Sequence, residues 1–251
     1  FVGYSLLSMF KPFNKVAEII RYHHVPWGLG AGRTFGEKPV PVESHIIHLA
    51  DRLAVLIDRK QEVLGQVPAI KGKIFGLGSE WFMPDALMAL DKLASIESFW
   101  LDAHSEINLY TLENILRLDV MELDQDALLA LSHLFAYIID FRSHFTSTHT
   151  AGVAATAEAL AKIFSFSSRE CRAIKVAGNF HDIGKLAIPK EILEKPGKLT
   201  DAEERVMRSH TFYSYKILEP IAELRIINAW GSFHHERLNG AGYPFHLKEA
   251  E

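Results

Sequence analysis

Residues 179–185 read Asn-Phe-His-Asp-Ile-Gly-Lys and are the most informative stretch of this 251-residue chain. The stretch places His181 directly beside Asp182, at the expected end of a helix over 168–181. Imidazole nitrogen and carboxylate oxygen are common ligands of iron, manganese, zinc, cobalt and nickel. Gly184 indicates a close approach of the backbone just before Lys185. The segment therefore predicts a metal site built on helices.

The chain holds 13 histidines, and several of them flank this stretch on separate predicted helices. A single histidine on a helix is more often a surface or hydrogen-bonded core residue than a ligand. The joint pattern favours a metal centre, and six ligands are too many for one closed tetrahedral site. They predict a binuclear centre with open positions, which suits the hydrolysis of a phosphodiester. The candidate metal ligands are His149, His181, Asp182, His210, His234 and His235.

Candidate catalytic and substrate-binding residues lie beside these ligands. Asp182 and Lys185 are the candidate catalytic residues; Lys185 either meets a phosphate as a point charge or is a solvated surface lysine. Arg237 either pairs with phosphate or caps a helix, and residues 242–244 form either a substrate-contacting loop or a plain turn. Glu236, next to two ligands, is a candidate for orienting them. The candidate substrate-binding residues are Lys185, Arg237, Gly242, Tyr243 and Pro244.

The hydrophobic pattern is helical along most of the chain, so the predicted fold class is all-α, with no strand ladder. Residues 65–79 are Gly-rich and are expected to form a loop, apart from a short helix near 67–75. A helix start is predicted at Ser167 or Ser168, and a capping box at Thr200 with Glu203. The remaining helices are predicted over 1–24, 42–59, 84–96, 112–118, 126–142, 149–164, 168–181, 201–219 and 221–235.

An internal repeat is indicated by matches at a constant offset of 211 residues, which pair His23 and His24 with His234 and His235. The same offset pairs Phe1, Tyr4 and Leu7 with Phe212, Tyr215 and Leu218. The alternative is chance similarity between amphipathic helices. The repeat predicts two partial copies of one kind of domain, over residues 1–105 and 106–251.

Composition excludes several classes of protein. With 27 basic and 31 acidic residues and no basic arm, nothing indicates a nucleic-acid polymer as partner. The single cysteine, Cys171, excludes an internal disulfide and a Cys-rich zinc site, and favours a reducing, cytoplasmic setting. No apolar run reaches about 18 residues, so no transmembrane helix is expected.

These motifs resemble the HD-GYP family of HD-superfamily phosphohydrolases. The resemblance covers about residues 130–251 and rests on residues 181–185, 188–189, 192–193, 195–197, 199–200, 234–237 and 240–244. It implies an HD-domain-like helical bundle that holds two or three metal ions, usually iron or manganese. It also implies hydrolysis of the bacterial messenger cyclic di-GMP to the linear dinucleotide and GMP. Carried over by position, the family's metal ligands are the six residues named above, with Lys185 near the phosphate and Gly242, Tyr243 and Pro244 in the named loop.

The chain departs from the family pattern at three places. Phe145 stands where members with three metals carry a glutamate, which favours two metal ions, and Asn239 stands where the family has an aspartate. The last aspartate ligand of the second copy would lie about ten residues beyond Glu251 if the repeat offset holds. Asp51, which resembles that ligand in the first copy, is an alternative donor to the centre, within one chain or across a dimer.

Three functions stay open on the sequence. The first is a cyclic di-GMP phosphodiesterase, and the second is a phosphohydrolase of the same family that acts on another nucleotide, because a fold does not determine its substrate. The third is a non-catalytic signalling scaffold. The sequence also leaves open a homodimer or a signalling-protein partner.

Overall fold

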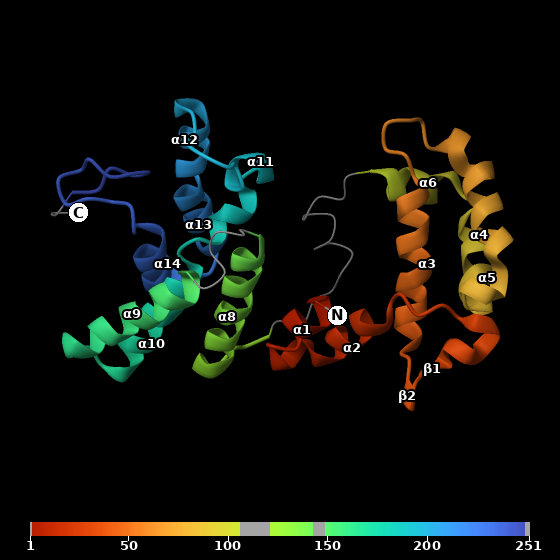
Figure 1. Ribbon diagram of the computed structural model, residues 1–251, viewed down its shortest axis with the longest axis horizontal. Helices are drawn as coiled ribbons and strands as arrows, with labels where there is room; N and C mark the ends of the chain where they lie inside the picture. The colour runs from red at the N-terminus through yellow and green to blue at the C-terminus, as the bar shows by residue number, and fades with distance from the viewer. Residues whose placement is uncertain (1, 106–120, 143–148, 249–251) are drawn as a thin grey trace. The chain divides into compact units, whose positions relative to one another are not determined.

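The computed structural model describes residues 2–105, 121–142 and 149–248 (Figure 1). The chain divides into two compact units, the first made of Phe1–Ser8 and Pro12–Glu122 and the second of Met9–Lys11 and Leu123–Glu251. The helix predicted over 112–118 and the position of Phe145 lie outside the described residues. Among the described residues, no helix is long and apolar enough to span a lipid bilayer.

Helices make up most of the first unit, and Ile74, Phe82 and Trp100 are among the largest side chains of its core. A short strand pair joins Thr34 to Pro39 and Phe35 to Lys38 in antiparallel register. The elements of this unit are α1 (Val2–Leu7), α2 (Asn14–Tyr22), η2 (Gly28–Arg33), β1 (Thr34–Phe35), β2 (Lys38–Pro39), α3 (Val42–Leu56), η3 (Leu64–Gln66), α4 (Val67–Trp81), α5 (Pro84–Leu93) and α6 (Glu97–His104).

Two expectations for this unit are wrong. The Gly-rich residues 65–79 mostly belong to the helix α4, because Ile70 and Ile74 lie one turn apart and are both buried. Burial of that face outweighs the cost of a glycine inside a helix, about 1 kcal/mol relative to alanine. The short strand pair was not expected either; it turns at Gly36, whose φ of 63° suits glycine.

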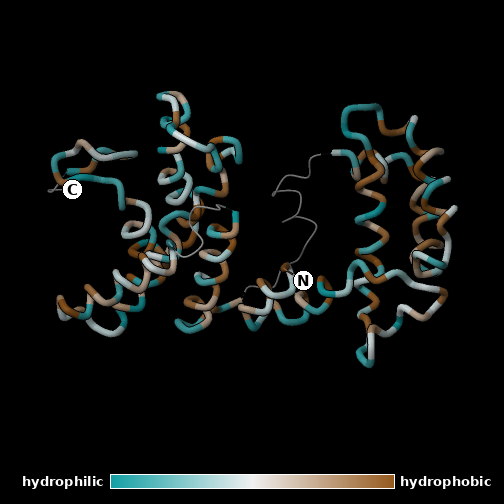
Figure 2. Tube along the Cα trace, viewed as in Figure 1, coloured by the Kyte–Doolittle hydropathy of each residue, from teal (hydrophilic) through white to brown (hydrophobic). Residues whose placement is uncertain are grey.

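The second unit is built around α10 (Ser168–Phe180), which packs against α8 (Gln125–Arg142), α9 (His149–Ile163) and α14 (Arg225–Ser232). Figure 2 shows hydrophobic and hydrophilic residues alternating along its helices, as expected for helices with one buried face. The other elements are η4 (Ile183–Ala187), α11 (Lys190–Leu193), α12 (Asp201–Arg208), α13 (His210–Leu218) and η5 (Ala222–Leu224).

Two helix starts in this unit agree with the sequence. Ser167 caps α10 and forms a capping box with Glu170, and Thr200 forms one with Glu203 at the start of α12. The single helix predicted over 201–219 is wrong in one respect, because it is interrupted at Ser209 and divides into α12 and α13. The interruption is important because it makes His210 the first residue of a new helix.

Glycines allow the helices of this unit to approach closely. A Cβ on Gly178 of α10 would lie 2.7 Å from Cα of Ala154 in α9. A Cβ on Gly231 of α14 would lie 3.0 Å from the carbonyl oxygen of Ala177 in α10. Real Cβ atoms essentially never come within 3.0 Å of other heavy atoms, so a side chain at Gly178 would push the helices apart and one at Gly231 would lie at this limit. These two contacts bring the metal-ligand candidates at the ends of α10 and α14 toward the start of α9.

Candidate metal centre

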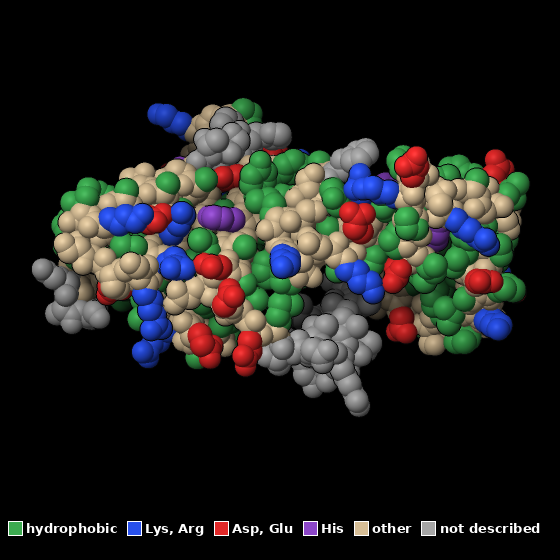
Figure 3. Space-filling model, turned by 90° about the horizontal axis from the view of Figure 1, so that it is seen from below, with side chains coloured by type: hydrophobic (Ala, Val, Ile, Leu, Met, Phe, Trp, Pro, Cys, Tyr) green, Lys and Arg blue, Asp and Glu red, His purple; other side chains and the backbone are tan. Residues whose placement is uncertain are grey.

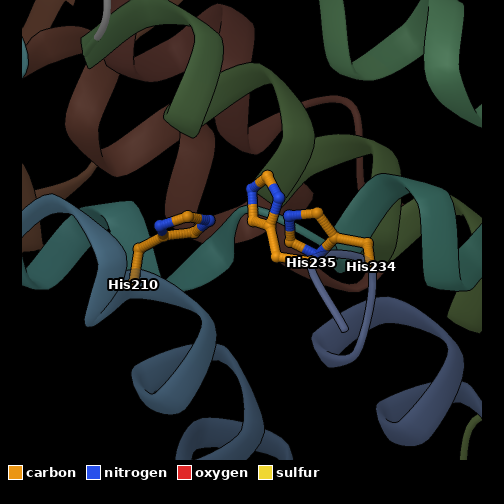
Figure 4. Close-up of side chains that lie close together, drawn as sticks. All are labelled: His210, His234 and His235. Atoms are coloured by element: carbon orange, nitrogen blue, oxygen red, sulfur yellow. The ribbon is translucent and has the colours of Figure 1, made fainter. Parts of the chain in front are cut away.

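The six candidate metal ligands come together in the second unit. Their ligand atoms form two groups, within each of which all atoms lie within 4.8 Å of one another. His149 is the first residue of α9, His181 and Asp182 follow α10, His210 begins α13, and His234 and His235 follow α14. Figure 4 shows the ring of His210 facing those of His234 and His235 from a different helix. The groups are His149, His181 and Asp182, and His210, His234 and His235.

Three of the histidines are oriented in the same way. Each of His181, His210 and His234 directs its Nδ1 to the backbone carbonyl three residues earlier. These carbonyls lie in the last turn of a helix, where they have no partner within the helix. In the neutral ring Nδ1 therefore carries the proton, and Nε2 is the atom that can bind a metal. The acceptors are the carbonyls of Gly178, Met207 and Gly231, each 2.7 Å from the ring nitrogen.

Asp182 lies between the two groups, and its side chain is only 4% exposed. One carboxylate oxygen is 3.0 Å from Nε2 of His181, and the other is 3.3 Å from Nε2 of His210 and 4.0 Å from Nε2 of His234. The Nε2 of His210 is buried without a hydrogen-bond partner. In the neutral ring this Nε2 presents a lone pair to a carboxylate oxygen, and a cation between the two atoms would stabilise the arrangement. Atoms that share one metal at about 2.1 Å lie roughly this far apart, so this donor set fits metal ions.

Charge and burial favour ligation further. Burial alone would raise the pKa of Asp182, but the neighbouring His181, His210 and Lys185 outweigh it and hold that pKa well below its usual range. Asp182 is therefore ionised at neutral pH. Burial lowers the pKa of His234 to about 4, and also lowers the pKa of His235. Both rings are therefore neutral at pH 7, as metal ligands must be.

A cavity of about 650 Å³ opens beside the two groups. Lys185 lies in its wall, with Nζ 2.6 Å from a carboxylate oxygen of Asp182 and a side chain that is 17% exposed. Tyr243 also lines the cavity, stacked on His235 with ring centroids 4.8 Å apart. Arg237 is exposed, and neither it nor Gly242 or Pro244 is among the lining residues. The structure thus brings two of the five candidate substrate-binding residues to the cavity.

Glu236 and Gly242 organise the loop that carries Tyr243. The Glu236 carboxylate accepts hydrogen bonds from the backbone amides of Phe245, His246 and Leu247, at 2.6, 3.2 and 3.1 Å. Gly242 packs against the backbone of Glu236, where a Cβ has no room. Glu236 directly follows His235, so its hydrogen bonds fasten residues 245–247 next to the two histidines.

Two residues near the centre were not anticipated from the sequence. The Ser214 hydroxyl is buried; it donates to the carbonyl of His181 and accepts from the amide of Gly184, each at 2.9 Å. Trp230 lines the cavity. The available signal was their spacing. Ser214 follows His210 by four residues and Trp230 precedes His234 by four, a spacing that places two residues on one face of a helix. Neither residue type marks a metal site by itself.

His23 and His24 in the first unit resemble their proposed counterparts in local geometry. Nδ1 of His23 lies 2.5 Å from the carbonyl oxygen three residues earlier, and the two rings are 3.9 Å apart, against 4.2 Å for His234 and His235. A carboxylate oxygen of Asp51 lies 3.4 Å from a guanidinium nitrogen of Arg52. Among the described residues, no group of three ligand atoms includes His23, His24 or Asp51. The upstream copy stays a prediction.

Charges are mixed on the face of the molecule in Figure 3, where lysines and arginines alternate with acidic residues. No extended basic surface is visible among the described residues of that face.

Comparisons with known proteins agree with this geometry. A family model described as HD domain matches residues 133–251. The 3'3'-cGAMP-specific phosphodiesterase 1 of Vibrio cholerae is 30% identical over 99% of this chain and 59% of its own length. The cyclic di-GMP phosphodiesterase response regulator RpfG of Xanthomonas campestris is 36% identical over 53% of this chain and 36% of its own length.

One solved structure has a similar fold. The crystal structure of a cyclic GMP-AMP-specific phosphodiesterase of Vibrio cholerae, V-cGAP3, covers 91% of this chain and 58% of that chain, with a TM-score of 0.60. The identity is 22%, so the likeness concerns the fold alone. This chain thus spans about three-fifths of the length of the first relative and of the solved chain.

Proposed function

Because a family model described as HD domain matches residues 133–251 and named relatives are cyclic dinucleotide phosphodiesterases, we propose that this part of the chain is an HD-GYP-like, metal-dependent phosphodiesterase. Its substrate is a cyclic dinucleotide, and its products are the linear dinucleotide and then mononucleotides. The observation that carries the proposal is the pair of three-ligand groups joined by Asp182 beside a cavity of about 650 Å³. Cavities of this size bind ligands well above the size of one phosphate.

In this proposal each group of three ligands would hold one divalent ion, with Asp182 between the two groups. Bound divalent ions supply a nucleophile at neutral pH and neutralise the charge of the attacked phosphate. The carbonyl contacts of His181, His210 and His234 keep the ligand atoms directed inward, so little reorganisation is required on metal binding. Lys185 exchanges part of its contact with Asp182 for a phosphate oxygen and holds the substrate in line.

Two ions, iron or manganese, are the proposed cofactor. Nitrogen and carboxylate donors suit these metals, and Phe145 provides no carboxylate for a third ion. Asp51 as a further ligand stays a prediction, as do the cytoplasmic setting and a homodimer or signalling partner. Metal content measured on an Asp51→Asn variant tests the first of these, since a lost ion would support it.

Two substrates are candidates. Cyclic di-GMP follows from the family resemblance and is supported by relatives with that name, including RpfG. The mixed dinucleotide 3'3'-cGAMP is the second candidate, because the relative that aligns over 99% of this chain has that specificity in its name. A direct comparison of kcat/KM for the two decides between them.

The test is a hydrolysis assay on the purified chain after anaerobic loading with Fe²⁺ or Mn²⁺. We expect about two ions per chain by elemental analysis, and linear dinucleotide from at least one of the two substrates. The Asp182→Asn variant is the negative control. A fully loaded chain that releases no product from either substrate would contradict the proposal and support the scaffold alternative.

A further inference from the structure

One side of the cavity in the second unit contributes no metal ligand and no charged side chain. Its side chains are Val153 and Ala157 of α9, Ile174 and Ala177 of α10, and Trp230 of α14. We call these five residues the apolar wall. It is continuous with the metal centre because the three helices that form it also present His149, His181 and His234 at their ends.

Helix geometry determines how far the apolar wall extends from the metal centre. His149, Val153 and Ala157 are spaced four residues apart on one face of α9, so the wall reaches about 12 Å from His149 along that helix at about 1.5 Å per residue. Trp230 precedes His234 by four residues, about 6 Å along the chain direction of α14. The close approaches at Gly178 and Gly231 place α10 directly against both α9 and α14. The wall therefore reaches beyond the metal ligands on both α9 and α14, where a group attached to a phosphate at the centre would lie.

Trp230 is unusual for its position in the fold. Its neighbours Ile227 and Gly231 are buried, yet Trp230 itself is 42% exposed and borders the cavity. A single exposed apolar side chain is common on protein surfaces. A large aromatic ring that remains open to solvent beside a candidate catalytic centre is a site for stacking. The chemistry recognised by such a wall is flat, aromatic and uncharged.

We propose that the apolar wall binds one purine base of the cyclic dinucleotide, which stacks on Trp230 while the attached phosphate lies at the metal centre. The inference rests on the proposed function and adds a specificity-determining residue to it. Stacking of a base on an aromatic side chain strengthens binding by roughly 5- to 150-fold. Trp230 would therefore act on substrate binding and not on the chemical step.

The test uses two substitutions that separate stacking from packing. Trp230→Leu keeps an apolar side chain of considerable size but removes the ring, whereas Trp230→Phe keeps a ring. Ile226→Ala is the matched control, because Ile226 lies on the same helix, is 57% exposed and does not line this cavity. KM and kcat are measured on metal-loaded chains with whichever cyclic dinucleotide the wild type hydrolyses.

We expect Trp230→Leu to raise KM by roughly 5- to 150-fold with kcat nearly unchanged, and Trp230→Phe to recover most of the loss. Metal content should equal that of the wild type in all three variants. A KM for Trp230→Leu within twofold of the Ile226→Ala value would overturn the proposal, as would a loss of kcat alone.

Binding measured apart from turnover keeps the two proposals distinct. A phosphorothioate cyclic dinucleotide is titrated into the metal-loaded chain, and quenching of tryptophan fluorescence is followed. Quenching that disappears in Trp230→Phe supports the stacking proposal even if the wild type turns over no substrate, a result that would contradict only the proposed function. Quenching that is unchanged in Trp230→Phe would contradict the stacking proposal even if hydrolysis is fast.

Discussion

Replacing Ser214 by alanine should weaken the turn that carries Asp182. In the folded protein the Ser214 hydroxyl joins the carbonyl of His181 to the amide of Gly184, with both distances 2.9 Å and the side chain fully buried. Alanine leaves one carbonyl and one amide without partners. Each buried, unpaired backbone group costs about 1–3 kcal/mol, so the two together cost about 2–6 kcal/mol. For a protein of this size that corresponds to a fall in Tm of roughly 5–20 °C.

The assay is differential scanning calorimetry with and without metal, which identifies the transition of the second unit by its dependence on metal. Ser209→Ala is the matched control, because that hydroxyl is exposed and bonds only the nearby carbonyl of Val206, at 2.6 Å. Metal affinity should also fall for Ser214→Ala, since His181 and Asp182 belong to the weakened turn. If Ser214→Ala melts within about 1 °C of Ser209→Ala, the two buried bonds do not hold the turn and the reasoning is refuted.

Three further predictions follow from the same unit. Asp182→Asn should reduce the bound metal below two ions per chain by elemental analysis, and a full complement would show that Asp182 does not bridge. Gly178→Ala should destabilise the unit by about 1–3 kcal/mol in urea unfolding, because its Cβ would meet Ala154 at 2.7 Å; an unchanged midpoint would contradict this. Hydrogen bonds from two lysines lower the pKa of Glu158 to about 2, so the stability that they contribute is complete above pH 4.5 and is lost as the pH falls toward 2. Glu158→Gln should remove this pH dependence of the free energy of unfolding, whose size is at most about 1 kcal/mol for an exposed pair. If the variant keeps the pH dependence of the wild type, the two lysine contacts of Glu158 are not its cause.

Much of the helical order follows from local sequence. The capping residues Ser167 and Thr200 mark helix starts that the structure confirms, because a cap depends on hydrogen bonds within four residues. The same local reasoning fails for residues 65–79, where glycines suggest a loop but the buried Ile70 and Ile74 favour a helix. Burial depends on what packs against a segment, and the segment alone does not contain that information.

The candidate ligands were recognisable because His and Asp at helix ends are rare enough to stand out in sequence. Trp230 and Ser214 were not, since each is an ordinary residue type whose role comes from what lies across from it. Trp230 becomes notable only when the cavity beside the histidines is known. Ser214 becomes notable only when α13 is seen to pack against η4.

The sequence by itself determined the all-helical class, the helix starts and the six candidate ligands, because periodicity, capping and residue chemistry act over a few neighbours. Only the tertiary structure decided that these ligands form two groups with Asp182 between them. That arrangement depends on helices that pack closely where Gly178 and Gly231 lack a side chain. It depends also on helix-end carbonyls that orient His181, His210 and His234. Contacts within the centre join residues far apart in the sequence, such as the rings of His181 and His234.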